Sequence, residues 1–63
     1  MTTYTVKVRV TSKYHTTFFE YVDVEEVVGP LTAGDAARCT AEAMYPLSRC
    51  VVTEIAEKDP QDE

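Results

Sequence analysis

The amino-acid sequence predicts an α+β domain in which two strands, one helix and a third strand follow one another in the order ββαβ. Three segments alternate between apolar and polar residues, which is typical of strands with one buried face. Between the second and third of them lies an Ala-rich segment that ends before Pro46, as expected of a helix. We expect one domain over residues 1–57 and a flexible acidic tail over residues 58–63.

A right-handed crossover sets the expected arrangement of the strands. Such a crossover through the helix places the third strand parallel to the second. The first strand then fits between them and runs antiparallel to both. This gives a three-stranded antiparallel-type sheet of order 2-1-3, with one helix packed on one face and the other face open.

The first predicted strand covers residues 4–10 and alternates without interruption, which suits a central position. The side chains expected on its buried face are Tyr4, Val6, Val8 and Val10. The side chains expected on its open face are Thr5, Lys7 and Arg9.

The second predicted strand covers residues 17–25, after a turn at residues 11–16, and its two faces are less distinct. One face carries Phe18, Glu20, Val22 and Val24, and the other carries Phe19, Tyr21 and Asp23. Either the Phe18 face is buried with Glu20 near an edge, or a bulge switches the faces midway along the strand. In both cases at least one aromatic ring stays on the open face.

The predicted helix spans residues 33–45, with Thr32 as its N-cap residue and an acidic residue three positions later. We expect Arg38 at the centre of the solvent face, with Gly34 and Glu42 beside it. The side chains expected to face the sheet are Ala33, Ala36, Thr40, Ala43 and Met44.

The third predicted strand covers residues 49–56, and its alternation places Cys50 and Val52 together on the open face. A disulfide with Cys39, on the flank of the helix, would need Cys50 to point toward the helix instead. We therefore expect two reduced, partly buried thiols.

The composition is that of one small globular domain. The chain has 63 residues, of which 44% are hydrophobic and 27% charged, and a net charge of −5. Residues 1–13 hold three bases and no acid, whereas residues 14–63 hold three bases and all eleven acids. The chain lacks both a long apolar run and a signal-peptide pattern, so we expect a cytoplasmic protein without membrane contact.

The sequence argues against catalysis and against metal or cofactor binding. His15 is the only histidine and falls in a predicted turn, with no nucleophile placed beside it. The spacings of His15, Cys39 and Cys50 match no zinc pattern, and two glycines cannot form a phosphate loop. A ligand pocket of several hundred cubic ångströms is hard to fit inside one copy of this chain. We expect no enzyme, no cofactor and no metal.

The open face of the sheet is the predicted binding surface, since exposed aromatic and aliphatic side chains on a sheet usually mark a contact. Its residues are expected to be Thr5, Lys7, Arg9, Phe19, Tyr21 and Val52. A separate acidic surface is expected from Glu20, Asp23, Glu25 and Glu26.

These surfaces favour a small non-catalytic protein-binding module. The expected partners are a second copy of the chain, forming a homodimer, and an unidentified protein with a basic surface that the module docks or inhibits. One alternative is single-stranded nucleic-acid binding by Lys7, Arg9, Phe19 and Tyr21. Another is a purely structural dimeric accessory subunit.

The order of several segments also resembles small hypothetical ββαβ proteins of bacteriophages and actinobacteria. The segments are Val22–Val24, Thr32–Ala37, Met44–Pro46 and Val51–Ile55. The resemblance covers most of the chain as a pattern of an extended hairpin, an Ala-rich helix and one closing strand. It implies a fold and a setting in a bacterial cell or an infected host, and no activity.

Overall fold

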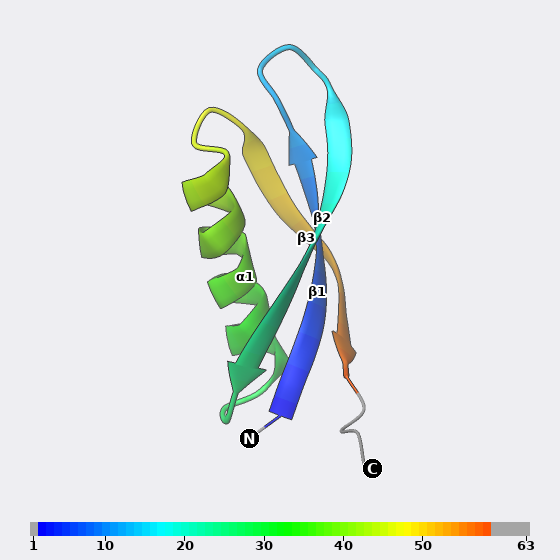
Figure 1. Ribbon diagram of the computed structural model, residues 1–63, viewed down its shortest axis with the longest axis vertical. Helices are drawn as coiled ribbons and strands as arrows, with labels where there is room; N and C mark the ends of the chain where they lie inside the picture. The colour runs from blue at the N-terminus through cyan, green and yellow to red at the C-terminus, as the bar shows by residue number, and fades with distance from the viewer. Residues whose placement is uncertain (1, 59–63) are drawn as a thin grey trace.

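The computed structural model describes residues 2–58 and confirms the ββαβ order. Strand β1 spans Thr2–Thr11, β2 spans Thr17–Glu26, helix α1 spans Pro30–Met44 and β3 spans Arg49–Glu57 (Figure 1). Each strand is one to three residues longer than its alternation pattern indicated, because the ends of the strands carry polar residues on both faces.

The sheet has the predicted order, β2-β1-β3. Strand β1 pairs antiparallel with both neighbours, so that Val6 lies opposite Val22 on one side and Ile55 on the other. Helix α1 connects the two edge strands and lies along one face of the sheet (Figure 1). No described element covers the opposite face, which we call the open face.

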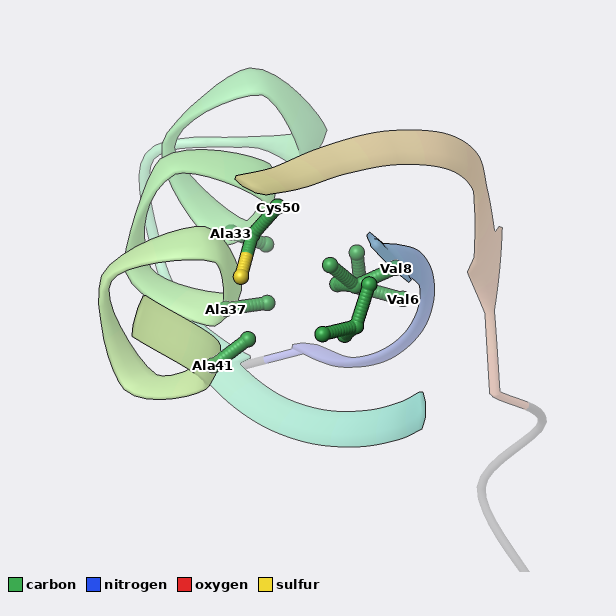
Figure 2. Packing of buried hydrophobic residues seen from close by; sticks show 7 residues of the cluster. Val6, Val8, Ala33, Ala37, Ala41 and Cys50 are labelled. Atoms are coloured by element: carbon green, nitrogen blue, oxygen red, sulfur yellow. The ribbon is translucent and has the colours of Figure 1, made fainter. Parts of the chain in front are cut away.

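The core lies between β1 and α1 and is built from small and β-branched side chains. Its fully buried members are Val6, Val8, Val10, Ala33, Ala37 and Ala41, and Cys50 is 6% exposed. In Figure 2 the Cys50 sulfur points toward the alanines of α1, while the valines approach from β1. Burying each valine contributes roughly 1.5–2 kcal/mol, so the three valines provide a large part of the stability of so short a chain.

The start of the helix differs from the prediction. Helix α1 begins at Pro30, with Gly29 as the N-cap residue, and no described side chain caps it. The Gly29 backbone has φ 157° and ψ −177°, a conformation that is essentially restricted to glycine, and Pro30 has the φ that a first helical position needs. Thr32 therefore lies exposed inside the first turn, and its assignment as the N-cap was wrong.

Of the helix residues expected to face the sheet, only Ala33 is fully buried there. Ala33, Ala37 and Ala41 face the sheet at a spacing of four residues, whereas Thr40, Ala43 and Met44 are exposed and Ala36 is half-buried. Gly34, expected beside Arg38 in solvent, is buried as well, and a Cβ atom at that position would lie 2.9 Å from Cδ1 of Ile55. The missing side chain lets the helix approach β3 closely.

A β-bulge in β3 accounts for the error in the third strand. Lys7 lies opposite Glu54, but Val8 lies opposite Val52, so Thr53 is an extra residue. The Thr53 hydroxyl donates a hydrogen bond to the carbonyl oxygen of Lys7 at 3.0 Å. Because of this shift Val52 and Ile55 both face the helix, and so does Cys50.

In β2 the first of the two alternatives is correct. Phe18, Val22 and Val24 pack against the core, and Glu20 lies at the edge of the sheet. The Phe18 ring meets Tyr45 edge-on, with ring centroids 5.1 Å apart, and the Tyr45 hydroxyl donates to a Glu20 carboxylate oxygen at 3.2 Å. Loss of hydration, and then the nearby Glu20 carboxylate, raises the pKa of Tyr45 above its ordinary value.

The end of the described chain stays on the sheet. The amide of Lys58 donates to the carbonyl oxygen of Thr3 at 2.8 Å, which continues the pairing of β3 with β1 by one residue. Lys58, the first residue of the predicted tail, directly follows the last residue of β3. Residues 59–63, the remainder of the predicted tail, lie outside the described residues.

Candidate functional site: the open face of the sheet

The open face carries five of the six predicted binding residues. Strand register places Thr5 opposite Asp23, Lys7 opposite Tyr21 and Arg9 opposite Phe19. Directly opposed residues in a sheet have side chains on the same face. Along β1, Thr5, Lys7 and Arg9 alternate with the buried valines and so point to the open face. The structure therefore brings Thr5, Lys7, Arg9, Phe19 and Tyr21 together.

Val52 is the exception, and its assignment to the open face was wrong. Its side chain packs against the core from the helix side, because the bulge at Thr53 changes which residues of β3 face outward. Val51 takes its place on the open face, opposite Arg9, and is 37% exposed. An uninterrupted alternation pattern gives no signal for a one-residue bulge.

The centre of the open face is aromatic. Phe19 is 48% exposed and Tyr21 is 63% exposed, and Val51 lies across β1 from Phe19. The Lys7 ammonium lies 4.4 Å from the centroid of the Phe19 ring and 6.0 Å from that of Tyr21. This cation–π contact holds one aromatic ring in place and occupies part of the ring surface that a nucleobase would need for stacking.

Charge changes sign along the open face. Toward the β1–β2 hairpin it carries Arg9 and Arg49, and register places Lys7 next to them at the centre. Toward the other end β2 contributes Asp23 and Glu25. The half of the open face nearest the hairpin is therefore basic and the other half acidic, and at the centre Lys7 lies opposite both Tyr21 and Glu54.

The acidic half is partly neutralised within the chain. Asp23 accepts a hydrogen bond from the Thr5 hydroxyl at 2.9 Å and forms an ion pair with Lys58 at 3.2 Å. These contacts, the Thr5 hydrogen bond first and Lys58 second, hold the pKa of Asp23 below its ordinary value of 3.8. Glu25 has no such partner among the described residues.

The four predicted acidic residues do not form one surface. Asp23 and Glu25 lie on the open face, whereas Glu20 and Glu26 alternate with them and lie on the helix side. Glu20 accepts from Tyr45, and Glu26 accepts from the backbone amides of residues 27 and 28 at 3.1 and 3.3 Å. Residues adjacent along a strand point to opposite faces, so a run of acids in sequence is divided by the sheet.

The two cysteines are free thiols in different surroundings. Cys39 is exposed on the outer side of α1, whereas Cys50 is buried beneath it. Burial, and then the Glu42 carboxylate, raises the pKa of the Cys50 thiol. Contrary to expectation, Cys50 points toward the helix. Cys39 lies on the exposed side of α1, away from Cys50, and both thiols are free.

Among residues 2–58, no three side chains of His, Cys, Asp or Glu are grouped to hold a metal ion. The 15-residue helix is also too short and too polar to cross a membrane. The chain does have a solvent-open depression of about 710 Å³ at the hairpin end of the sheet, which the sequence reasoning did not expect.

A second exposed apolar patch lies at the turn between β2 and α1. Val27 is 72% exposed, Val28 76% and Leu31 81%. The patch is a single turn at one end of the molecule. It is smaller than the open face and carries no pattern of charge that indicates a partner.

Comparison with known proteins adds no relative: no family model, curated protein or solved structure matches the chain.

Proposed function

We propose that this chain is a non-catalytic protein-binding module whose open face pairs with the open face of a second copy. The observation that carries this proposal is the change of charge along the face, from Arg9 and Arg49 near the hairpin to Asp23 and Glu25 at the other end, with the exposed Tyr21 ring between them. A surface of this kind is complementary to itself.

The geometry of a two-fold pair makes use of that complementarity. When two sheets stack face to face about a two-fold axis that runs across the strands, the basic half of each copy meets the acidic half of the other. Phe19, Tyr21 and Val51 then meet their own counterparts near the axis, where burial of apolar surface stabilises the contact. Lys7 above Phe19 favours such a protein contact over stacking with nucleobases.

The size of the face limits the strength of the pair. Three strands of nine or ten residues present a face of roughly 30 Å by 15 Å, or about 450 Å² before side-chain relief. Standard protein interfaces bury about 800 Å² on each partner. We therefore expect a dimer that dissociates on dilution through the micromolar range.

A pair of matched variants tests the proposal. Tyr21→Ser removes an aromatic ring from the open face, and Tyr14→Ser removes one that is 78% exposed in the hairpin turn. In sedimentation experiments across a concentration series, we expect Tyr21→Ser to weaken pairing by about tenfold or more, while Tyr14→Ser pairs as the parent does. Circular dichroism checks that both variants fold.

A parent chain that sediments as a monomer at every concentration up to millimolar would refute pairing. Equal weakening by the two tyrosine variants would show that the contact lies elsewhere. In either case the open face would lose its proposed role.

A further inference from the structure

The depression at the hairpin end of the open face gathers basic side chains from two distant parts of the sequence, the β1–β2 hairpin and the start of β3. Arg9 comes from β1, Lys13 and His15 from the β1–β2 turn, and Arg49 from the start of β3. Register explains the convergence, because Arg49 lies opposite Thr11, two residues beyond Arg9 on the same face. In Figure 1 the β1–β2 turn and the α1–β3 connection lie at the same end of the molecule.

The charge of this depression is opposite to that of the chain. Its walls carry two arginines, one lysine and one histidine, and none of the described residues that line it is acidic. The whole chain has a net charge of −5. Arg9, Lys13 and Arg49 are all exposed, so together they present a concentration of positive charge that can attract a ligand with negative charge.

Hydroxyl groups lie among the cations. The Thr11 and Thr17 hydroxyls lie 3.4 Å apart on opposed strands, at the base of the hairpin. The Ser12 side chain accepts from the amides of Tyr14 and Thr16, both at 3.2 Å, and this fixes the turn that carries the basic residues. His15 has φ 68°, a left-handed conformation that a fixed turn can maintain.

We propose that this depression binds the phosphate groups of an anionic ligand. Arginine presents a planar set of N–H donors that matches phosphate oxygens, and threonine hydroxyls donate to the same oxygens. A volume of about 710 Å³ is in the range of small-molecule sites and holds more than one phosphate group. The ligand is therefore a compound with linked phosphates or a stretch of nucleic-acid backbone, and phosphate is the chemistry that both share.

The site does not depend on pairing of the open face. It is complete within one copy, since all its residues belong to one chain. Arg9 contributes to both proposals, so we expect phosphate and a second copy to compete. A phosphate ligand would then shift the dimer toward monomer, whereas a failure of pairing would leave phosphate binding intact.

The test is a titration of the full chain with inorganic pyrophosphate at low ionic strength, followed by amide NMR. We expect saturable shifts confined to residues 9–17 and 47–49. Arg49→Gln should weaken binding by about tenfold or more, the loss of one charged hydrogen-bonding partner. Arg38→Gln makes the same charge change on α1, where Arg38 pairs with Glu42 at 3.0 Å, and should bind as the parent does.

A second titration with oligothymidine DNA identifies the source of the phosphate. Tighter binding than pyrophosphate, with added shifts at Phe19 and Tyr21, assigns the site to a nucleic-acid strand. Equal or weaker binding assigns it to a small phosphate compound. Equal weakening by Arg49→Gln and Arg38→Gln, or no saturable shift with either probe, would overturn the proposal.

Discussion

The two faces of the sheet differ in the size, charge and packing of their side chains, although one strand supplies the centre of both. On the helix side β1 contributes Val6, Val8 and Val10, which are fully buried. On the open side the residues between them are Lys7 and Arg9, beside aromatic rings that are about half exposed. The two sets are separated because successive side chains of a strand point to opposite faces of the sheet.

This difference separates stability from binding. The helix side is closed by alanines and Gly34, which allow α1 to approach the sheet closely. On the open side the Phe19 and Tyr21 rings and the charged side chains of both signs remain exposed to solvent. Substitutions on the helix side should therefore change folding, and substitutions on the open side should change association.

The reactivity of the two thiols gives the largest expected contrast. Cys39 is exposed and should react with a thiol reagent at the rate of an unfolded chain, whereas Cys50 is buried and has a raised pKa. Because Cys50 must await opening of the fold, we expect it to react about a thousandfold more slowly. Mass spectrometry of Cys39→Ser and Cys50→Ser during labelling measures each rate, and equal rates would contradict the burial of Cys50.

The same substitution on the two faces gives the next contrast. Val8→Ala should lower the free energy of unfolding by about 2–3 kcal/mol, from lost burial and the cavity left behind. Val51→Ala, on the open face, should cost about 1 kcal/mol or less. Urea denaturation measures both, and similar losses would show that the open face contributes to the core.

Charge-reversal variants on the open face test whether that face mediates pairing of two copies. Arg9→Glu places an acid in the basic half of the face and Glu25→Arg places a base in the acidic half, so each variant alone should pair about tenfold more weakly. A mixture of the two should pair again, because opposite halves then meet. Sedimentation of the mixture tests this, and a mixture that stays monomeric would contradict the two-fold arrangement.

The smallest expected effect is the loss of folding stability in acid when Asp23 becomes protonated. The pKa of Asp23 is lowered in the folded chain by the Thr5 hydroxyl and then by Lys58, so its contribution to stability is present above pH 3.8. That contribution is lost as the pH falls through the lower, folded-state pKa. Thr5→Val removes the hydroxyl donor and should make the loss of stability in acid shallower. An unchanged acid profile in thermal melts would count against the Thr5–Asp23 contact.

The sheet could be predicted from sequence because two strong rules apply to it. The regular alternation of β1 identifies its faces and favours a central position, and a right-handed crossover makes β3 parallel to β2; together they give the order 2-1-3. Five of the six open-face residues follow from these rules. Val52 does not, because the bulge at Thr53 depends on pairing with β1 and leaves no local pattern.

The helix face and the basic depression were harder to predict for a different reason. Alanines occur on several sides of α1, so hydrophobicity alone does not select the stripe of Ala33, Ala37 and Ala41. The contact between Gly34 and Ile55, which are far apart in sequence, accompanies that choice. Arg49 lies beside the basic residues of the β1–β2 hairpin only because strand pairing places it opposite Thr11. Writing out the pairing of the predicted third strand with the first, residue by residue, could have found this neighbour.

The most direct test of the central claim, that the open face is the surface that binds, is a dilution series followed by amide NMR. We expect concentration-dependent shifts between micromolar and millimolar chain at Phe19, Tyr21 and Val51, with the amides of α1 unchanged. Shifts confined to the apolar turn at Val27 and Val28, or a spectrum that does not change with concentration, would contradict it.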